Sequence, residues 1–272
     1  MSILEAIFLG LVQGLTEFLP ISSSGHLVIF GHLIESGKPS LLFDVFVHLG
    51  TLIAILIYYR DEVIRLIISM RSLPAYFRRE KISEQNTDSL RFQSYLVIGM
   101  IPVVLIALLL GYFIERFFYY PLFACVMLVV TGFILMLSKL APVEKNRLNL
   151  KIITMIGVAQ ALALFPGISR SGTTIAVALI LGVDKERAAK FSFFLAIPAI
   201  IGAVVMTLFK TSVLEMAQAD WLPILFGTVV ASASGYAAIE LLLRALRKGE
   251  LYYFSYYCWG VGILGFIKFW NG

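Results

Sequence analysis

The sequence has few charged residues, few cysteines and no internal linker. Charged residues make up 14% of the 272 positions and hydrophobic residues 60%, which excludes an ordinary soluble domain and indicates an integral membrane protein. No Pro-, Gly- or Ser-rich stretch divides the chain, so we expect a single membrane domain over 1–272. Cys125 and Cys258 lie in apolar runs and indicate neither a disulfide framework nor a cysteine metal site.

The excess of basic residues does not indicate a nucleic-acid partner. The net charge is +5, but the Lys and Arg residues lie in short loops between apolar runs, where they report membrane topology. The N-terminus lacks the basic region and the small-residue cleavage site of a signal peptide. We therefore expect the first apolar segment to be retained, and membrane lipids to surround the chain.

Long apolar runs predict an all-α membrane protein. Each of six runs is long enough to cross a bilayer with some tilt: 43–59, 92–114, 119–140, 188–209, 222–246 and 251–270. Two further apolar regions, 1–34 and 150–183, are broken in the middle by Pro, Gly and Ser. Their halves are too short to cross alone, so we expect two re-entrant helical hairpins. The alternative is one kinked span in each region.

The two broken regions are similar to each other. The segment 13-QGLTEFLPISSSG-25 aligns without a gap with 160-QALALFPGISRSG-172, and seven of the thirteen positions are identical. Several identical positions are polar, so shared hydrophobicity alone does not explain the match. Each broken region is followed by three spans, which predicts two repeat units, 1–140 and 150–272.

Positive charge predicts how the two units are oriented. Lys and Arg residues crowd four segments that we expect on the cytoplasmic side: 60–91, 139–151, 184–190 and 244–248. Three connections carry few basic residues and are expected outside: those near Lys38, Arg116 and Lys210. An odd number of spans per unit inverts the second unit, which places both termini outside and brings the hairpin tips together near the bilayer midplane.

The two tips differ in the polar groups that they would bring together. The aligned copies differ at three such positions: Glu17 corresponds to Leu164, Ser23 to Arg170 and His26 to Thr173. The tips together predict an anion site, because Arg binds phosphate through two N–H groups and serine-rich helix starts direct N–H groups at phosphate oxygens. Gln13 shares a helix face with Glu17, and both could hold a divalent cation, Mg²⁺ or Ca²⁺, that bridges phosphates.

At these residues the sequence resembles the undecaprenyl-diphosphate phosphatases, which confer bacitracin resistance on bacteria. Two motifs carry the resemblance: Gln13 to Glu17 followed by 20-PISSSGH-26, and 166-PGISRSGTT-174. The resemblance implies metal-assisted hydrolysis of the terminal phosphate of a C55 polyprenyl diphosphate, which recycles the lipid carrier of cell-wall synthesis. It also implies the bacterial plasma membrane, with a site open to the periplasmic or outer face. The sequence leaves a homo-oligomer open.

The resemblance assigns roles by position. Gln13 and Glu17 fall on the motif for metal or base, with the weaker metal role at Gln13 because other members have Glu there. The expected catalytic residues are Glu17, Ser23, His26 and Arg170. The expected phosphate-binding residues are Ser22, Ser169, Arg170, Ser171, Gly172 and Thr174.

Three nucleophiles remain open for phosphoryl transfer. Ser23 comes first, with His26 as its base, because a serine hydroxyl is weak until a base takes its proton. His26 could instead attack directly through a phosphohistidine. Water is the third alternative.

Two other function classes use similar residues. A transporter or flippase of a phosphorylated lipid would need the same anion site, but a nucleophile beside a base matters only for chemistry. A type 2 phosphatidic acid phosphatase needs a second histidine after its Ser-Arg, and all three histidines occur by position 48, so we reject it. We expect His32 and His48 to be hydrogen-bonded packing residues. An interfacial aromatic belt is expected at Tyr252, Tyr253, Tyr256 and Tyr257.

Overall fold

The computed structural model describes residues 1–33, 41–78, 80–142, 147–210 and 219–270, and its regular structure in these ranges is helical. The α-helices are α1 (Ile3–Phe18), α2 (Ser23–Leu33), α3 (Leu41–Tyr58), α4 (Arg60–Ser69), α5 (Leu73–Phe77), α6 (Glu84–Glu115), α7 (Pro121–Leu137), α8 (Leu150–Leu162), α9 (Arg170–Ile180), α10 (Lys185–Lys210), α12 (Trp221–Lys248) and α13 (Tyr253–Trp270). Short 3₁₀ turns follow α4, α6 and α7. The all-α class is confirmed.

Five helices are long and apolar enough to cross a membrane: α3, α6, α7, α10 and α12. They match five of the six predicted spans. The sixth predicted span, 251–270, falls on α13, which is not among the five. Tyrosines, tryptophans and Lys268 lower the mean hydropathy of this helix, so a full crossing by α13 stays a prediction.

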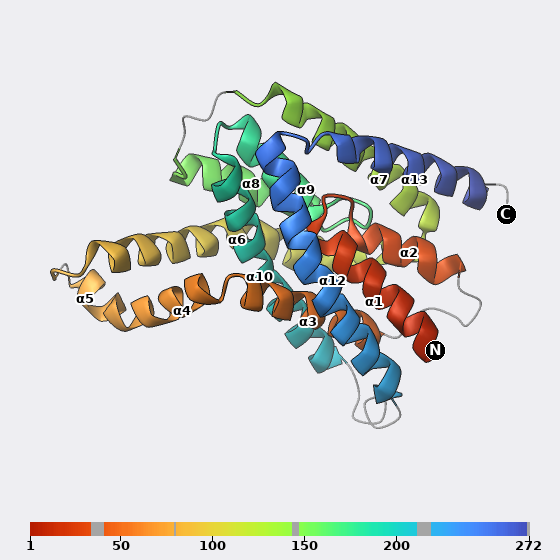
Figure 1. Cartoon of the computed structure of the whole chain (residues 1–272), viewed down its shortest axis with the longest axis horizontal. Coiled ribbons are helices and arrows are strands. Elements are labelled where there is room, and N and C mark those ends of the chain that lie inside the picture. Colours follow the sequence, from red (N-terminus) through yellow and green to blue (C-terminus); the bar gives the residue numbers. More distant parts are fainter. Residues whose placement is uncertain (34–40, 79, 143–146, 211–218, 271–272) are drawn as a thin grey trace.

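Four shorter helices form two hairpins. α1 and α2 have 16 and 11 residues, and α8 and α9 have 13 and 11, whereas a crossing needs about 20 residues. The helices of each pair pack against each other, and α1 and α2 visibly fold back (Figure 1). Each broken region is therefore a hairpin of two helices and not one kinked helix.

Local sequence explains where each hairpin turns. Pro20 disfavours the helical conformation at the residue before it, and Leu19 is extended with ψ 143°. Ser22 then adopts a left-handed φ of 68°, and Ser23 begins α2. In the second hairpin Gly167 supplies the left-handed turn, with φ 99°. The breaks noted in the sequence are the turns of the structure.

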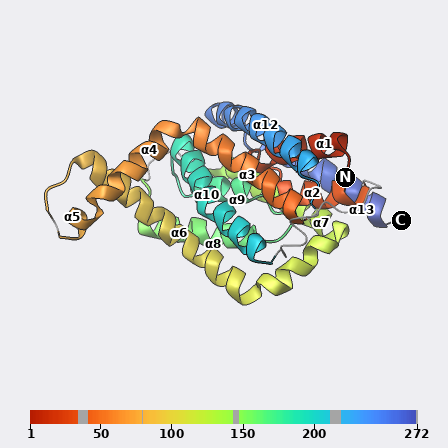
Figure 2. The same ribbon diagram turned by 90° about the horizontal axis from the view of Figure 1, so that it is seen from below.

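The two halves of the chain pack on each other reciprocally. α1 packs along α12, and α8 packs along α6. A methyl group on Gly10 of α1 would lie 2.4 Å from the carbonyl oxygen of Gly227, and one on Gly157, its counterpart in α8, would lie 2.4 Å from that of Gly99. Figure 2 shows α6 and α12 on opposite sides of the molecule, with α3 and α10 between them. The hairpin of each half is therefore held by a long helix of the other half.

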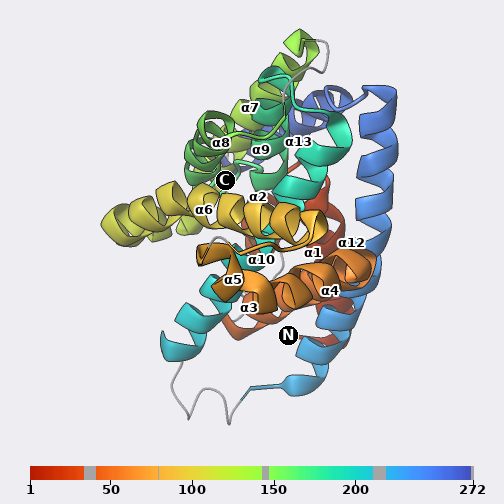
Figure 3. The ribbon, with the colours of Figure 1, turned by 90° about the vertical axis from the view of Figure 1, so that its left-hand side faces the viewer.

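The central core joins the first hairpin to the second half of the chain. Phe18 is fully buried at the end of α1 and packs edge-on against Phe193 of α10, with ring centroids 5.5 Å apart. Seen from the side, the α8–α9 hairpin and the α7–α13 pair lie above α1, α3 and α4 (Figure 3). This core places the two hairpin turns in the interior.

One part of the molecule projects away from the bundle. α4, α5 and the start of α6 extend together to the left in Figures 1 and 2, and the two chain ends lie on the opposite side. Gln93 of α6 donates hydrogen bonds to the carbonyl oxygen of Leu66 and to Ser69 Oγ, at 2.7 and 2.9 Å. Lys190 of α10 forms an ion pair of 3.0 Å with Glu62 of α4. The expected outer connections near Lys38 and after Lys210 fall in ranges outside the described residues.

Candidate active site

The tips of the two hairpins touch through backbone. A methyl group on Gly25 would lie 2.9 Å from Gly167 Cα, and one on Gly172 would lie 3.1 Å from the Pro20 carbonyl oxygen. In the sequence alignment Gly25 corresponds to Gly172, and Pro20 to Gly167. The two contacts are therefore equivalent: each tip contributes the counterpart of the residue that the other tip contributes. The predicted convergence of the tips is present in the structure.

The two tips also repeat the same hydrogen bonds. Ser22 Oγ accepts the Gly25 N–H at 3.2 Å and lies 3.3 Å from Ser24 Oγ. Their counterparts in the second tip do the same: Ser169 Oγ accepts the Gly172 N–H at 3.0 Å and lies 3.4 Å from Ser171 Oγ. Hydroxyl groups that accept the N–H groups of a first helical turn are N-caps. The serines common to both copies therefore build the helix starts.

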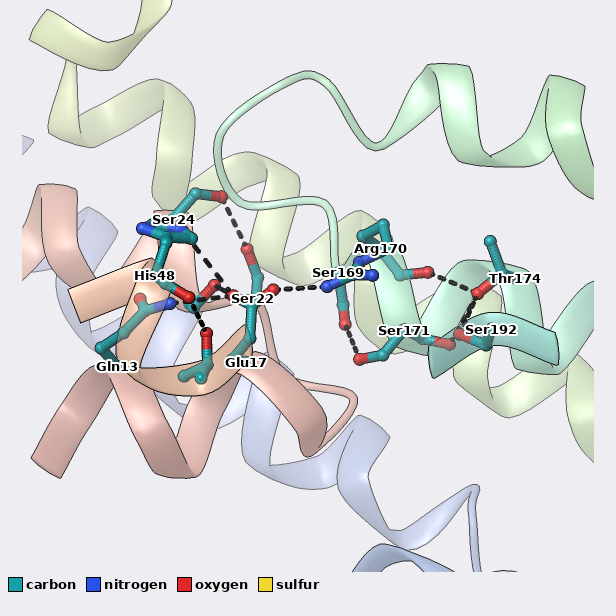
Figure 4. Close-up of polar contacts among 12 residues, drawn as sticks. Gln13, Glu17, Ser22, Ser24, His48, Ser169, Arg170, Ser171, Thr174 and Ser192 are labelled. Carbon is teal, nitrogen blue, oxygen red and sulfur yellow. Dashed lines mark hydrogen bonds and ion pairs between the residues drawn. The ribbon is translucent and has the colours of Figure 1, made fainter. Parts of the chain in front are cut away.

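Glu17 lies at the junction and binds groups from both tips (Figure 4). Its Oε1 forms an ion pair with Arg170 Nη2, from the start of α9. Its Oε2 accepts hydrogen bonds from Ser23 Oγ at 2.5 Å and from Gln13 Nε2 at 3.0 Å. Glu17 is only 8% exposed. A buried carboxylate is tolerated when it is paired and hydrogen-bonded in this way.

His26 does not contact Ser23 in the way that the sequence led us to expect. Its Nδ1 lies 2.8 Å from the carbonyl oxygen of Ser22, and its Nε2 lies 3.0 Å from the hydroxyl of Tyr257. The hydroxyl of Ser23 is instead bonded to Glu17. The geometry of α2 is the reason. His26 lies four residues after Ser22, so its side chain reaches back along the first turn of α2 to the Ser22 carbonyl oxygen. Any catalytic role of His26 stays a prediction.

Two residues near the site were not predicted. His48 of α3 was expected to be a packing residue, but its Nε2 lies 3.8 Å from Glu17 Oε2 while its Nδ1 bonds to the Asp44 carbonyl oxygen at 2.6 Å. Tyr257 was expected in an interfacial belt, but its hydroxyl reaches His26. Tyr257 is 231 residues from His26 in the sequence, and no motif marks it. His48 lies on the helix that follows the first hairpin. Only the spacing of polar residues on one face of α3, Asp44 to His48, was a signal.

The predicted phosphate-binding residues divide into two groups. Ser169 is fixed at the junction by a hydrogen bond from its N–H to Thr131 Oγ1 at 3.0 Å, and Ser171 Oγ lies 3.5 Å from the Leu19 carbonyl oxygen. Thr174 lies one turn further along α9, where its hydroxyl contacts Ser192 Oγ at 2.6 Å and the Arg170 carbonyl oxygen at 2.8 Å. Thr174 therefore joins α9 to α10, whereas the two serines lie where the tips meet.

The sequence profile of the family described as "Bacitracin resistance protein BacA" matches residues 6–264. The chain belongs to this family. Proteins named undecaprenyl-diphosphatase from Halothermothrix orenii and Methanobrevibacter smithii are 42% and 45% identical to it, and the alignments cover 97% and 98% of both chains. One of the same name from Carboxydothermus hydrogenoformans is 41% identical over 97% of this chain and 96% of its own. The family expectation from the two motifs is confirmed.

A cation site in this BacA family member would depend mainly on Glu17. In the described part of the chain no group of three or more His, Cys, Asp or Glu residues could hold a metal ion. Gln13 Oε1 is buried without a hydrogen-bond partner, as a cation ligand would be before binding. Gln160, the counterpart of Gln13, also has a buried unpartnered Oε1 but corresponds to a site without the carboxylate. The unpartnered oxygen alone therefore does not indicate a metal.

Proposed function

We propose that this membrane enzyme hydrolyses the terminal phosphate of undecaprenyl diphosphate and releases undecaprenyl monophosphate. Three relatives that align over nearly the full chain carry the name of that activity. The single observation that carries the chemistry is Glu17, held between the guanidinium of Arg170 and the hydroxyl of Ser23. These are the groups that phosphoryl transfer needs: a positive charge for phosphate oxygens, a nucleophile and a base. The product would return the lipid carrier to cell-wall synthesis.

Substrate binding begins at Arg170. Its side chain is 18% exposed and its fork is paired with Glu17. A diphosphate offers more acceptor oxygens and more charge than one carboxylate, so the guanidinium can turn two N–H groups to the terminal phosphate. The starts of α2 and α9 add N–H groups at the same place. Ser22, Ser169 and Ser171 keep these two helix starts in shape.

The first chemical step uses Ser23 and Glu17. Glu17 Oε2 takes the proton of Ser23 Oγ as that oxygen bonds to the terminal phosphorus. The bond from phosphorus to the bridging oxygen breaks, and the lipid monophosphate leaves with that oxygen. Glu17 passes its proton to the departing phosphate group. Water then attacks the phosphoserine while Glu17 takes a proton from the water; the bond from phosphorus to Ser23 Oγ breaks, that oxygen receives the proton from Glu17, and inorganic phosphate is released. The 2.5 Å hydrogen bond between Ser23 and Glu17 supports this base over the histidine expected from sequence. Direct attack by His26 requires that its Nε2 first leaves Tyr257.

We propose that a divalent cation, Mg²⁺ or Ca²⁺, binds beside these groups. A carboxylate has about four lone-pair sites, of which Arg170, Ser23 and Gln13 Nε2 occupy three. One remains, and Gln13 Oε1 is a second free acceptor. Mg²⁺ in particular is often held by one or two protein oxygens together with substrate phosphates and water. When bound, the cation would neutralise charge on the phosphate oxygens.

The experiment is phosphate release by the purified protein supplied with undecaprenyl diphosphate, with and without a chelator. We expect release that stops with chelator and returns with Mg²⁺ or Ca²⁺. Release that is unaffected by chelator would reject the proposed cation but would still support the proposed hydrolysis. No release from this or any shorter prenyl diphosphate would favour a transporter of a phosphorylated lipid, which the names of the relatives do not support.

The membrane arrangement follows from the positive charges. We propose that the two hairpins enter the bilayer of a bacterial plasma membrane from opposite sides, with both termini outside, 60–91 in the cytoplasm and the site open to the outer face. The separation of the chain ends from α4 and α5 supports this topology (Figure 1). The reciprocal contacts of Gly25 and Gly172 support an inverted repeat of 1–140 and 150–272.

A cysteine in place of exposed Arg71 tests the topology. We expect an impermeant maleimide to label Arg71→Cys only after the cells are permeabilised, because α4 and α5 would lie inside. The two native cysteines are buried and should react slowly. Labelling of Arg71→Cys in intact cells would show that α4 and α5 lie outside, opposite to the proposed orientation. The oligomeric state is a separate question, for which cross-linking of the purified enzyme is the direct measurement.

A further inference from the structure

The three histidines share one backbone contact that determines which nitrogen is free. In His26, His32 and His48, Nδ1 lies 2.6 to 2.8 Å from the carbonyl oxygen four residues earlier. A carbonyl oxygen only accepts hydrogen bonds, so Nδ1 carries the proton in each ring. In the neutral ring Nε2 is then an acceptor. The three residues therefore differ in what faces Nε2.

The Nε2 of His26 faces the hydroxyl of Tyr257. The two atoms are 3.0 Å apart, and the hydroxyl can donate to the ring. The rings are nearly parallel, with an interplanar angle of 12° and centroids 5.7 Å apart. His26 is 1% exposed, so Tyr257 fills the one hydrogen-bonding position that the imidazole has left.

Tyr257 is brought to this place by the packing of α13. Gly262 of α13 lies against the Cys125 carbonyl oxygen of α7, where a methyl group would be 2.8 Å away. Trp259 Nε1 donates to the Val129 carbonyl oxygen of α7 at 3.2 Å. The next residue after Tyr257, Cys258, has its sulfur 3.9 Å from the Pro20 carbonyl oxygen in the first hairpin turn. The phenol is therefore anchored on both sides.

Two hydrogen bonds connect Tyr257 to Ser22, the residue that precedes the proposed nucleophile. The Tyr257 hydroxyl donates to His26 Nε2, and the His26 Nδ1–H donates to the Ser22 carbonyl oxygen. Ser22 has a φ of 68°, a left-handed conformation that is unfavourable in a residue other than glycine. Such a conformation persists only where surrounding contacts hold it. Ser23 follows directly, and its hydroxyl meets Glu17.

We propose that Tyr257 is a positioning residue for hydrolysis: through His26 it holds the left-handed turn at Ser22 that presents the Ser23 hydroxyl to Glu17. The proposal rests on the proposed function. It gives His26 a structural reason to be buried next to the site without contact to Ser23. It also means that α13 stabilises the turn of the first hairpin.

The test is Tyr257→Phe, which keeps the stacked ring and removes only the hydroxyl. We expect kcat to fall about 5- to 10-fold, the effect of one neutral hydrogen bond, with KM within twofold of the wild type. Tyr256→Phe is the matched control, because Tyr256 lies on the same helix, is exposed, and packs on Tyr253 and Trp259. Its kcat should be unchanged.

A double variant separates positioning from a general loss of packing. If Tyr257 acts through His26, adding Tyr257→Phe to His26→Gln should cause no further loss. The double variant and the His26→Gln single variant should then have the same kcat. In addition, the ¹⁵N resonance of His26 Nε2 should shift in Tyr257→Phe and not in Tyr256→Phe. This chemical-shift measurement does not depend on enzyme activity.

Each outcome decides the proposal. Wild-type kcat in Tyr257→Phe overturns it, as does wild-type kcat in His26→Gln. Independent, multiplying losses in the double variant also overturn it. If the wild type itself releases no phosphate, the proposed function fails and this role in hydrolysis fails with it. Release by the wild type with an unaffected Tyr257→Phe variant instead rejects the inference alone.

Discussion

The two hairpin tips have the same backbone and different chemistry. Ser22 and Ser169 cap their helices with the same hydrogen bonds, and Gly25 and Gly172 make equivalent contacts across the junction. The charged groups are not shared: the carboxylate is on one tip and the guanidinium on the other. The comparison teaches that the common residues bring the tips together, while the residues that differ supply the charged groups to which we assign the proposed chemistry.

The largest expected effect is that of Ser23→Ala, which we compare with His26→Ala. Ser23→Ala should lower kcat by about 10⁴-fold or more, because it removes the attacking atom. His26→Ala should leave a measurable residual rate. The measurement is kinetics of both variants together with trapping of a phosphoenzyme. An acid-labile phosphoenzyme that survives in Ser23→Ala would instead make His26 the nucleophile.

Glu17→Gln should follow, with a loss of about 10²–10⁴-fold for a missing base. Gln keeps the size of the side chain but leaves Arg170 without its charge partner and Ser23 without an acceptor for its proton. Protein yield in the membrane is the control for folding. Turnover near the wild-type level would show that the difference between the tips at Glu17 and Leu164 is not catalytic.

Arg170→Lys should lower kcat/KM by about 10²-fold even though the charge is kept. A planar fork that holds two phosphate oxygens is not replaced by an ammonium group. The matched control is Arg187→Lys, because Arg187 is exposed and pairs with Asp184, three residues earlier on the same surface. Equal rates in the two variants would reduce Arg170 to a counter-charge.

The shared backbone contact predicts an effect on stability. Gly25→Ala and Gly172→Ala should each lower the free energy of unfolding by about 1–3 kcal/mol, because the added methyl group meets the opposite tip. Gly202→Ala is the control, since in the described part of the chain no atom beyond the local helix backbone lies within 4 Å of an added methyl group there. Thermal unfolding in detergent would give the three values. A large loss in only one of the two tip variants would break the equivalence of the tips.

The smallest effect concerns His48. His48→Gln should lower kcat about threefold to tenfold, because its Nε2 lies beside Glu17 at 3.8 Å without a short hydrogen bond. His32→Gln should leave kcat unchanged, since His32 has the same backbone contact and packs edge-on against Phe269 instead. A loss that is equal in both variants would indicate a packing effect.

Much of the fold could be predicted because helices in a membrane need long apolar runs. The repeat also predicted that Ser22 and Ser169 belong to equivalent turns, and the convergence of the tips predicted that Glu17 and Arg170 lie at one site. The partner of Ser23 could not be predicted, because it depends on the direction of α2 after the left-handed residue. His48 and Tyr257 could not be predicted for another reason: their contacts are set by how α3 and α13 pack on the first hairpin.

The length of α6 has a practical consequence. Its 32 residues follow a helical path of about 48 Å with Pro102 inside it, and the helix bends (Figure 2), whereas the hydrocarbon of a bilayer is about 30 Å thick. On the proposed topology, this excess length would place α4 and α5 in water, away from the hairpin junction. A fluorophore or epitope attached there would report on the folded enzyme in a living cell without touching its substrate. The same projection offers a rigid, polar handle for lattice contacts or an antibody fragment, which an otherwise lipid-covered molecule lacks.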